Sequence, residues 1–121
     1  MTSDEREAFR NSPIENVIAE KKLFSVDQNG QSQNVTIQIG RPYQVDEYEA
    51  ACSLALYGWT GRMPEIRNVD TLGAVCLAIR VAKIIMTGHL KSGGKVYWAE
   101  DRSEELSVEV VFPTQVPLPM E

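Results

Sequence analysis

The 121-residue sequence is poor in the residue types that form metal and redox centres. It contains two cysteines, Cys52 and Cys76, and a single histidine, His89. Neither cysteine belongs to a CxxC pair or has histidine neighbours at metal-ligand spacing, so we predict no metal site and no bound cofactor. Both cysteines lie in apolar segments, where we expect buried, reduced thiols.

Catalytic motifs are also lacking. The sequence has no nucleophile elbow, and KSGGK at residues 91–95 lacks the spacing and the following Ser or Thr of a P-loop. Neighbouring carboxylates such as Glu104 and Glu105 lie in polar segments, where no shared burial is expected to raise a carboxyl pKa for acid–base work. His89 follows the predicted end of a helix, where a cation is favoured by the helix dipole. We therefore expect that the protein is not an enzyme.

Basic residues are outnumbered, with 12 Lys and Arg against 17 Asp and Glu and a net charge of −5. This charge repels phosphate backbones and anionic lipids, and no local basic patch opposes it, so we predict no nucleic-acid binding. The start MTSDEREAFRNSPIEN lacks the apolar segment of a secretory signal. The longest apolar run contains Arg80 and Lys83 and looks too short for a bilayer. We expect a cytoplasmic protein without membrane contact.

Apolar residues alternate along several short segments, as they do in half-buried strands. Val35, Ile37 and Ile39 share one face of the clearest segment, and Asn29-Gly30 before it is a strong hairpin signal. In the segment 49–57 the small residues are expected on the exposed face. The strands that we predict cover residues 17–26, 35–39, 49–57, 65–69, 96–98 and 106–112.

Residues 70–88 predict one long helix, capped by Asp70 and ended by Gly88. Lys83 interrupts the arc that we expect to lie on the sheet, which consists of Leu72, Val75, Cys76, Ile79 and Met86. Further apolar residues lie outside this arc: Leu77, Val81, Ile84 and Ile85. Either a strongly twisted sheet and the terminal segments wrap around the helix, or the second apolar surface meets another chain.

The expected fold class is α+β, with an antiparallel sheet of about five strands, one long helix packed on it and a short N-terminal helix. Ser3 is placed to cap that short helix, and Pro13 follows its end. We expect an N-terminal arm at residues 1–13, a single domain at 14–113 and a Pro-rich tail at 114–121.

Several short strings occur in an order that resembles a family of small bacterial domains of unknown function. They are IAEKKL, VTIQIGRP, NVDTLGAVCLAI and the closing VFP, spread over about residues 17 to 113. The helix entry Asn68-Val69-Asp70 lacks the glycine of the family pattern, and this chain has additions at both termini. The resemblance implies a bacterial source and strands followed by a helix, and it implies no activity.

Two groups of residues are candidates for binding. Acidic residues gather after the predicted helix, with the single base Arg102 among them, and would attract a basic protein partner: Glu100, Asp101, Glu104, Glu105 and Glu109. Arg41, at a strand end beside Gly and Pro, could clamp an anion or bond to a neighbouring group in its turn. A ligand pocket around it would be formed by Arg41, Tyr43, Tyr57 and Trp59.

Three functions from different classes remain open. The leading hypothesis is a non-catalytic protein-binding module, most concretely a bacterial immunity or antitoxin-type protein that occludes a basic toxin partner. The alternative is a small homo-oligomeric structural or regulatory protein, in the simplest case a homodimer. The third is a small-ligand binding protein or enzyme that uses a pocket near Arg41.

Overall fold

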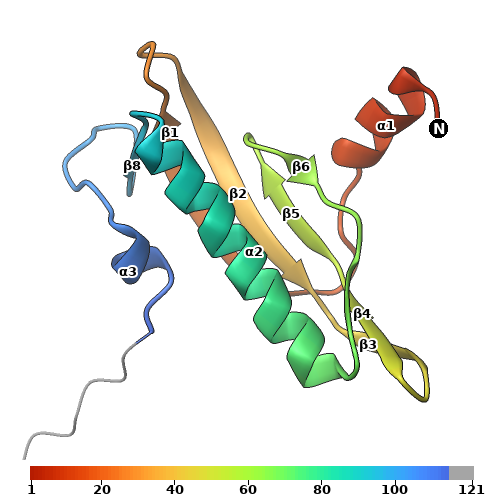
Figure 1. The fold of residues 1–121 in the computed structure, drawn as a ribbon. Helices are drawn as coiled ribbons and strands as arrows, with labels where there is room; N and C mark the ends of the chain where they lie inside the picture. The colour runs from red at the N-terminus through yellow and green to blue at the C-terminus, as the bar shows by residue number, and fades with distance from the viewer. Residues whose placement is uncertain (115–121) are drawn as a thin grey trace, which may run out of the picture.

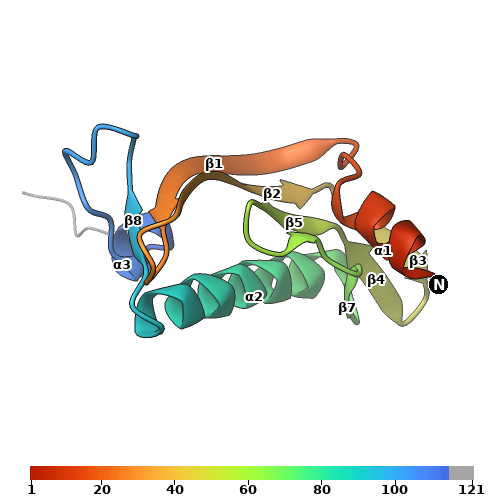
Figure 2. The ribbon, with the colours of Figure 1, turned by 90° about the horizontal axis from the view of Figure 1, so that it is seen from above.

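The computed structural model describes residues 1–114. It confirms the predicted α+β class, with helix α2 lying across one face of an antiparallel sheet and α1 set apart at the N-terminus (Figures 1 and 2). The elements follow one another in the order α1 (Ser3–Arg10), β1 (Val17–Val26), β2 (Ser32–Gly40), β3 (Tyr43–Asp46), β4 (Glu49–Cys52), β5 (Leu54–Tyr57), β6 (Gly61–Arg62), β7 (Ile66–Asn68), α2 (Thr71–Lys91), β8 (Lys95–Tyr97) and α3 (Val108–Val111).

The larger sheet has five strands in the order β6-β5-β2-β1-β8. Its longest pairing is the β1–β2 hairpin, which closes where Val26 faces Ser32. Gly30 in the turn has φ of 82°, a left-handed conformation that costs glycine little, so the predicted hairpin is confirmed. Val35, Ile37 and Ile39 of β2 are all buried, as their alternation predicts.

A second sheet has three strands in the order β3-β4-β7. The segment 49–57, predicted as one strand, is divided at Ser53 into β4 and β5, which belong to different sheets. The expected exposed face is also wrong, because Ala51 and Ala55 are fully buried. The strand β7 agrees with the short strand predicted at 65–69.

Helix α2 begins where the sequence predicts and ends three residues later. The Asp70 carboxylate accepts a hydrogen bond from the backbone N–H of Gly73 at 2.6 Å and caps the helix. The helix continues through Gly88 to Lys91, and the left-handed glycine is Gly93, with φ of 98°. His89 therefore lies in the last turn of the helix, not after it. A similar shift occurs at α1, where Thr2, not Ser3, is the cap.

The face of α2 that packs on the sheets is made of small residues. Ala74, Ala78 and Ala82 are fully buried together with Met86. The predicted arc is wrong except at Met86 and the partly buried Val75, because Leu72 is 73% exposed, Ile79 is 40% exposed and Cys76 is exposed. Small side chains let the helix backbone lie close to the strands, so the larger apolar residues are displaced to its flanks.

Of the two explanations for the second apolar surface of α2, wrapping by the fold accounts for part of it, and contact with another chain stays a prediction. Val81 and Ile85 are partly buried and pack against the core, so the fold does wrap around that flank. Ile84 is 60% exposed and Leu72 is more exposed still, and neither is covered by another part of residues 1–114.

The strand predicted at 106–112 is wrong, because residues 108–111 form the short helix α3. Only Leu106 continues the sheet, donating its backbone N–H to the carbonyl of Val96 at 2.8 Å. The Ser107 hydroxyl then accepts from the backbone N–H of Val110 at 3.3 Å and starts the short helix α3. A local cap thus outcompetes the alternation that predicted a strand. Beyond Thr114, the tail predicted for 114–121 lies outside the described residues.

Enlarging the alanine face should separate α2 from the sheets. We expect Ala78→Leu to lower the free energy of unfolding by about 1–3 kcal/mol, because overpacking a tight contact forces side chains and backbone to shift. The matched control is Cys76→Leu on the exposed side of the same helix, which should change stability by less than about 0.5 kcal/mol. Urea denaturation followed by circular dichroism measures both. Equal effects would show that the alanine face is not tightly packed.

The two thiols, predicted to behave alike, should differ in reactivity. Cys52 is fully buried, its Sγ lies 3.3 Å from the carbonyl oxygen of Gly40, and burial, with a smaller effect of Glu65, raises the pKa of its thiol. Cys76 is exposed. With Ellman's reagent at pH 8, Cys76 should react at the rate of a free cysteine and Cys52 only on unfolding. Rapid reaction of both thiols in the folded protein would contradict the assigned burial.

Candidate functional site

Four of the five predicted partner-binding acids lie together on the loop that follows β8. Glu100, Asp101, Glu104 and Glu105 are all exposed. The base among them, Arg102, has its guanidinium 5.7 Å from the ring of Phe24 and 6.0 Å from that of Tyr97, so it lies against the sheet. We call this segment, residues 100–105, the acidic loop.

Glu109, the fifth predicted acid, has a different environment. It lies on α3, not on a strand, and its carboxylate forms an ion pair with Lys83 of α2 at 3.8 Å. It also accepts a hydrogen bond from Thr114 at 3.0 Å. The ion pair with Lys83 links α3 to α2. Glu109 therefore belongs to this contact and not to the acidic loop.

Within the acidic loop, Asp101 is held ionised by its own backbone. Its carboxylate accepts a hydrogen bond from the backbone N–H of Ser103 at 3.0 Å. This bond, together with the Ser103 hydroxyl, lowers the pKa of Asp101. The loop therefore keeps this charge to a lower pH than an ordinary aspartate would.

An apolar groove lies between the inner side of β1 and helix α2. It has a volume of about 380 Å³. Its apolar lining includes Ile37 and Ile39 of β2, Ile79 of α2 and Phe112 after α3. Charged side chains line its rim: Glu20, Lys21 and Lys83. The groove exists because α2 packs mainly against β2, β4, β5, β7 and β8 and contacts β1 little, so that residues 17–20 of β1 stay exposed.

The strand beside this groove has a free edge. β2 pairs with β1 from Val17 to Val26, with a bulge at Ile18, whereas β8 pairs with β1 only at Phe24, Ser25 and Val26. Along residues 17–23 no described strand pairs with the other edge of β1. The side chains there are accessible, with Val17 38% and Ile18 53% exposed. An exposed edge of this length is a template for another strand.

The acidic loop starts where this free edge ends. Lys21 of β1 places its Nζ 3.9 Å from the centre of the Trp98 ring, at the beginning of the loop. The backbone N–H of Trp98 donates to the carbonyl of Glu104 at 3.1 Å, which folds the loop back beside β8. A segment lying along the free edge of β1 would therefore approach the acidic loop with one of its ends.

The exposed side of α2 adjoins the same region. A second hollow of about 710 Å³ is lined by Ile79, Ile84 and Cys76, together with the basic residues Arg80, Lys83 and Lys91.

With 21 residues, α2 is long and apolar enough to cross a membrane by length and composition, although the sequence suggested a shorter run. In this fold its alanine face packs on the sheets.

The four residues predicted to form a ligand pocket are separated in space. Arg41 and Tyr43 line one pocket. Tyr57 instead donates its hydroxyl to the carbonyl of Ser12 at 2.6 Å and ties the N-terminal arm to the sheet. Trp59 donates its indole N–H to the Ser25 hydroxyl at 3.0 Å, and its ring lies 5.1 Å from that of His89.

Ser25 and His89 form a polar contact in the core, with 3.0 Å between the hydroxyl oxygen and Nε2. Ser25 is 1% exposed, so no substrate can reach its hydroxyl. A Cβ on Gly94 would lie 2.4 Å from the imidazole ring, so only glycine leaves room for it. This cluster satisfies buried polar groups and holds the end of α2 on the sheet, and the geometry supports no catalytic role.

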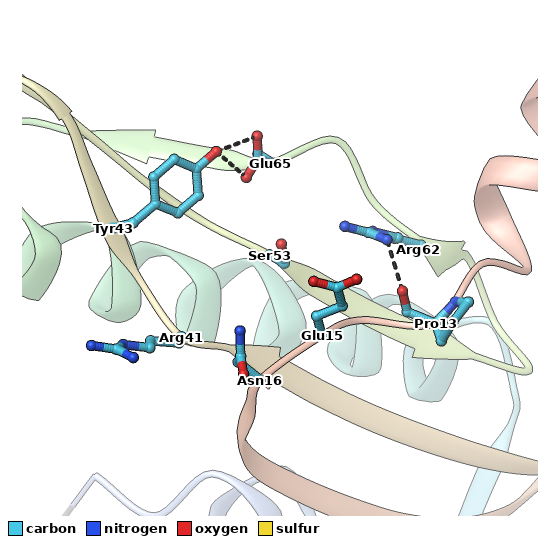
Figure 3. A pocket seen from close by; sticks show the side chains of 8 residues that line it. All are labelled: Pro13, Glu15, Asn16, Arg41, Tyr43, Ser53, Arg62 and Glu65. Atoms are coloured by element: carbon cyan, nitrogen blue, oxygen red, sulfur yellow. Dashed lines mark hydrogen bonds between the residues drawn. The ribbon is translucent and has the colours of Figure 1, made fainter.

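The pocket near Arg41 is polar and has a volume of about 520 Å³. Its lining comes from both sheets and from the segment that joins α1 to β1: Pro13, Glu15, Asn16, Arg41, Tyr43, Ser53, Arg62 and Glu65 (Figure 3). The Tyr43 hydroxyl donates to the Glu65 carboxylate, at 2.8 Å and 2.6 Å from its two oxygens, and this bond raises the pKa of Tyr43. A phenol held in its protonated form is a poor catalytic base.

Sequence reasoning did not find Glu15, Arg62 or Glu65, which lie far apart in the chain and carry no motif. It also missed the groove beside β1, because the position of α2 depends on which of its faces is buried. Comparison with models of known protein families, with curated proteins and with solved structures finds no match to this chain. The resemblance to a family of small bacterial domains therefore stays a prediction.

Proposed function

We propose that this protein is a non-catalytic binding module that captures an extended segment of a partner protein along the free edge of β1. The observation that carries the proposal is the free edge at residues 17–23 beside an apolar groove. In β-strand addition, backbone hydrogen bonds to an exposed edge supply affinity, and alternate side chains that enter a neighbouring groove supply specificity. Ile37, Ile39 and Ile79 offer that groove to every second side chain of the added strand.

Charge selects the partner in this proposal. The acidic loop lies at the end of the free edge, and the guanidinium of Arg102 lies near the rings of Phe24 and Tyr97. A captured segment with apolar residues at alternate positions and lysine or arginine at the end near the loop would match both surfaces. The net charge of −5 adds long-range attraction for a basic protein.

The concrete biological form of the proposal is an immunity or antitoxin-type protein that occludes a basic toxin. Its support is the combination of an acidic surface, a free edge and a groove of suitable chemistry. A second copy of this chain is the alternative occupant, because an edge strand can also pair with its own copy about a twofold axis. The oligomeric state of the free protein distinguishes a second copy from a partner segment.

A synthetic peptide of about ten residues that alternates valine and lysine is the probe for β-strand addition. An added strand uses the backbone N–H groups of every second residue, so N-methylation of one alternate set should weaken binding by at least about tenfold, and methylation of the other set should not. Fluorescence anisotropy with a labelled peptide measures this. Equal binding of both methylated peptides would show that charge alone attracts the probe and would overturn the proposal.

The groove and the occupant can be tested with two matched variants. Ile79→Ser should weaken peptide binding several-fold, whereas Leu72→Ser, on the same helix but outside the groove, should leave it unchanged.

Light scattering on the free protein gives the oligomeric state. A stable dimer that the valine–lysine peptide dissociates would assign the free edge to a second copy and contradict the partner-segment proposal.

Reversing the charge of the acidic loop should change the association rate more than the dissociation rate. We expect Glu104→Lys together with Glu105→Lys to slow association with the valine–lysine peptide by at least about tenfold at low salt, with a smaller effect at high salt because of screening. Glu5→Lys with Glu7→Lys on α1 is the control with the same change in net charge. Stopped-flow fluorescence measures the rates, and equal slowing by both pairs would remove the acidic loop from the proposal.

A further inference from the structure

The polar pocket lies where the chain passes repeatedly from one sheet to the other. Arg41 lies between β2 and β3, Ser53 between β4 and β5, and Glu65 between β6 and β7. The α1–β1 segment crosses the same place, held by a hydrogen bond from the Arg41 backbone N–H to the carbonyl of Asn16 at 2.8 Å. Asn16 has φ of 56°, a left-handed conformation in which the surrounding contacts hold it. The pocket wall is thus fixed by several crossings of the backbone.

One side of the pocket is internally satisfied. Glu65 accepts from the Tyr43 hydroxyl and lies 3.8 Å from the guanidinium of Arg67, which also pairs with Glu49. The Glu49 contact is the main cause of the raised pKa of Arg67. These groups have partners and form a stable polar wall.

The opposite side has charged groups whose bonding capacity is not used. Arg62 donates through Nη1 to the carbonyl of Pro13 at 2.8 Å and to the Ser12 hydroxyl at 3.3 Å, while its Nε is buried without an acceptor. Among residues 1–114, the carboxylate of Glu15 forms no hydrogen bond or ion pair. Figure 3 shows Glu15 and Arg62 extending toward the same space, with the Ser53 hydroxyl beside it.

We propose that this pocket binds a small zwitterion of the amino-acid class. The guanidinium of Arg62 takes the ligand carboxylate through Nη2, which makes no hydrogen bond within residues 1–114, because Nη1 is the nitrogen that bonds to Pro13 and Ser12. Glu15 takes the ligand ammonium, and the ring of Tyr43 flanks the ligand side chain. A volume of about 520 Å³ lies within the usual range for small-molecule sites. Opposite charges facing one space suit a zwitterion better than a simple anion, which Glu15 would repel. This site is independent of the proposed capture of a partner segment by β1.

The probes are free amino acids, each compared with its amide, which lacks the carboxylate, and its N-acetyl derivative, which lacks the ammonium. Titration of the isotope-labelled protein, followed by NMR, should show at least one free amino acid shifting the signals of Glu15, Arg62 and Tyr43. Both derivatives of that amino acid should bind at least about tenfold more weakly, since each loses one charged contact.

Glu15→Gln keeps the shape of the side chain and removes its charge. It should weaken binding of the free amino acid by about tenfold and leave the weak binding of its N-acetyl derivative unchanged. Glu47→Gln, an exposed acid outside the pocket, is the control and should have no effect. Because the Glu15 carboxylate makes no hydrogen bond or ion pair within residues 1–114, a folded Glu15→Gln variant is expected, and its melting temperature checks this.

Two results would overturn the proposal. One is that no free amino acid at millimolar concentration shifts the pocket signals. The other is that Glu15 and Arg62 pair with each other in solution, which would appear as a stability coupling in a double-mutant cycle of Glu15→Gln and Arg62→Gln without any ligand effect.

Discussion

The close packing of α2 on the two sheets determines most of what is unusual in this protein. Ala74, Ala78 and Ala82 are fully buried at the contact, and their small side chains bring the helix backbone near the strands. A helix placed there covers β2, β4, β5 and β7 and contacts β1 little. The larger apolar side chains, Ile79 among them, then line a groove instead of filling a core.

The groove and the free edge follow from that packing together with the short length of β8. Since β8 has only three residues, it pairs with the end of β1, and within residues 1–114 no strand pairs with residues 17–23 on that side. Natural proteins usually protect such an edge with charge, bulges or a covering segment. Here Glu20, Lys21 and Lys22 provide charge and a bulge lies at Ile18, while the side chains of Val17 and Ile18 remain accessible. The edge of β1 is therefore protected only in part, which agrees with the proposed pairing with a partner segment.

The elements with strong local signals could be predicted from the sequence. The Asn29-Gly30 turn fixed the β1–β2 hairpin, and Asp70 fixed the start of α2, because both depend on contacts a few residues apart. The buried face of α2 could not be predicted, because a large apolar side chain is favoured in the core only where the sheet leaves room for it. The strand predicted at 106–112 failed for a related reason, since Ser107 supplies a cap that alternation does not reveal.

The candidate sites also include parts that local sequence predicts and parts that depend on the tertiary fold. The four acids of the acidic loop are adjacent in sequence, and exposed acids in a polar segment were predictable. The polar pocket depends on the division of the chain between two sheets at Ser53, which brings Glu15, Arg62 and Glu65 together from distant positions. Only Arg41 and Tyr43 of that pocket were identified from the sequence, through the strand end that they share.

Amide hydrogen exchange in β1 tests the central claim most directly. If a partner segment adds to the free edge, the backbone N–H groups of residues 17–23 that point away from β2 should become protected when the valine–lysine peptide binds. The N–H groups that point toward β2 should change little, since they already pair within the hairpin. Protection confined to the acidic loop, or none in β1 at a saturating peptide concentration, would contradict the account.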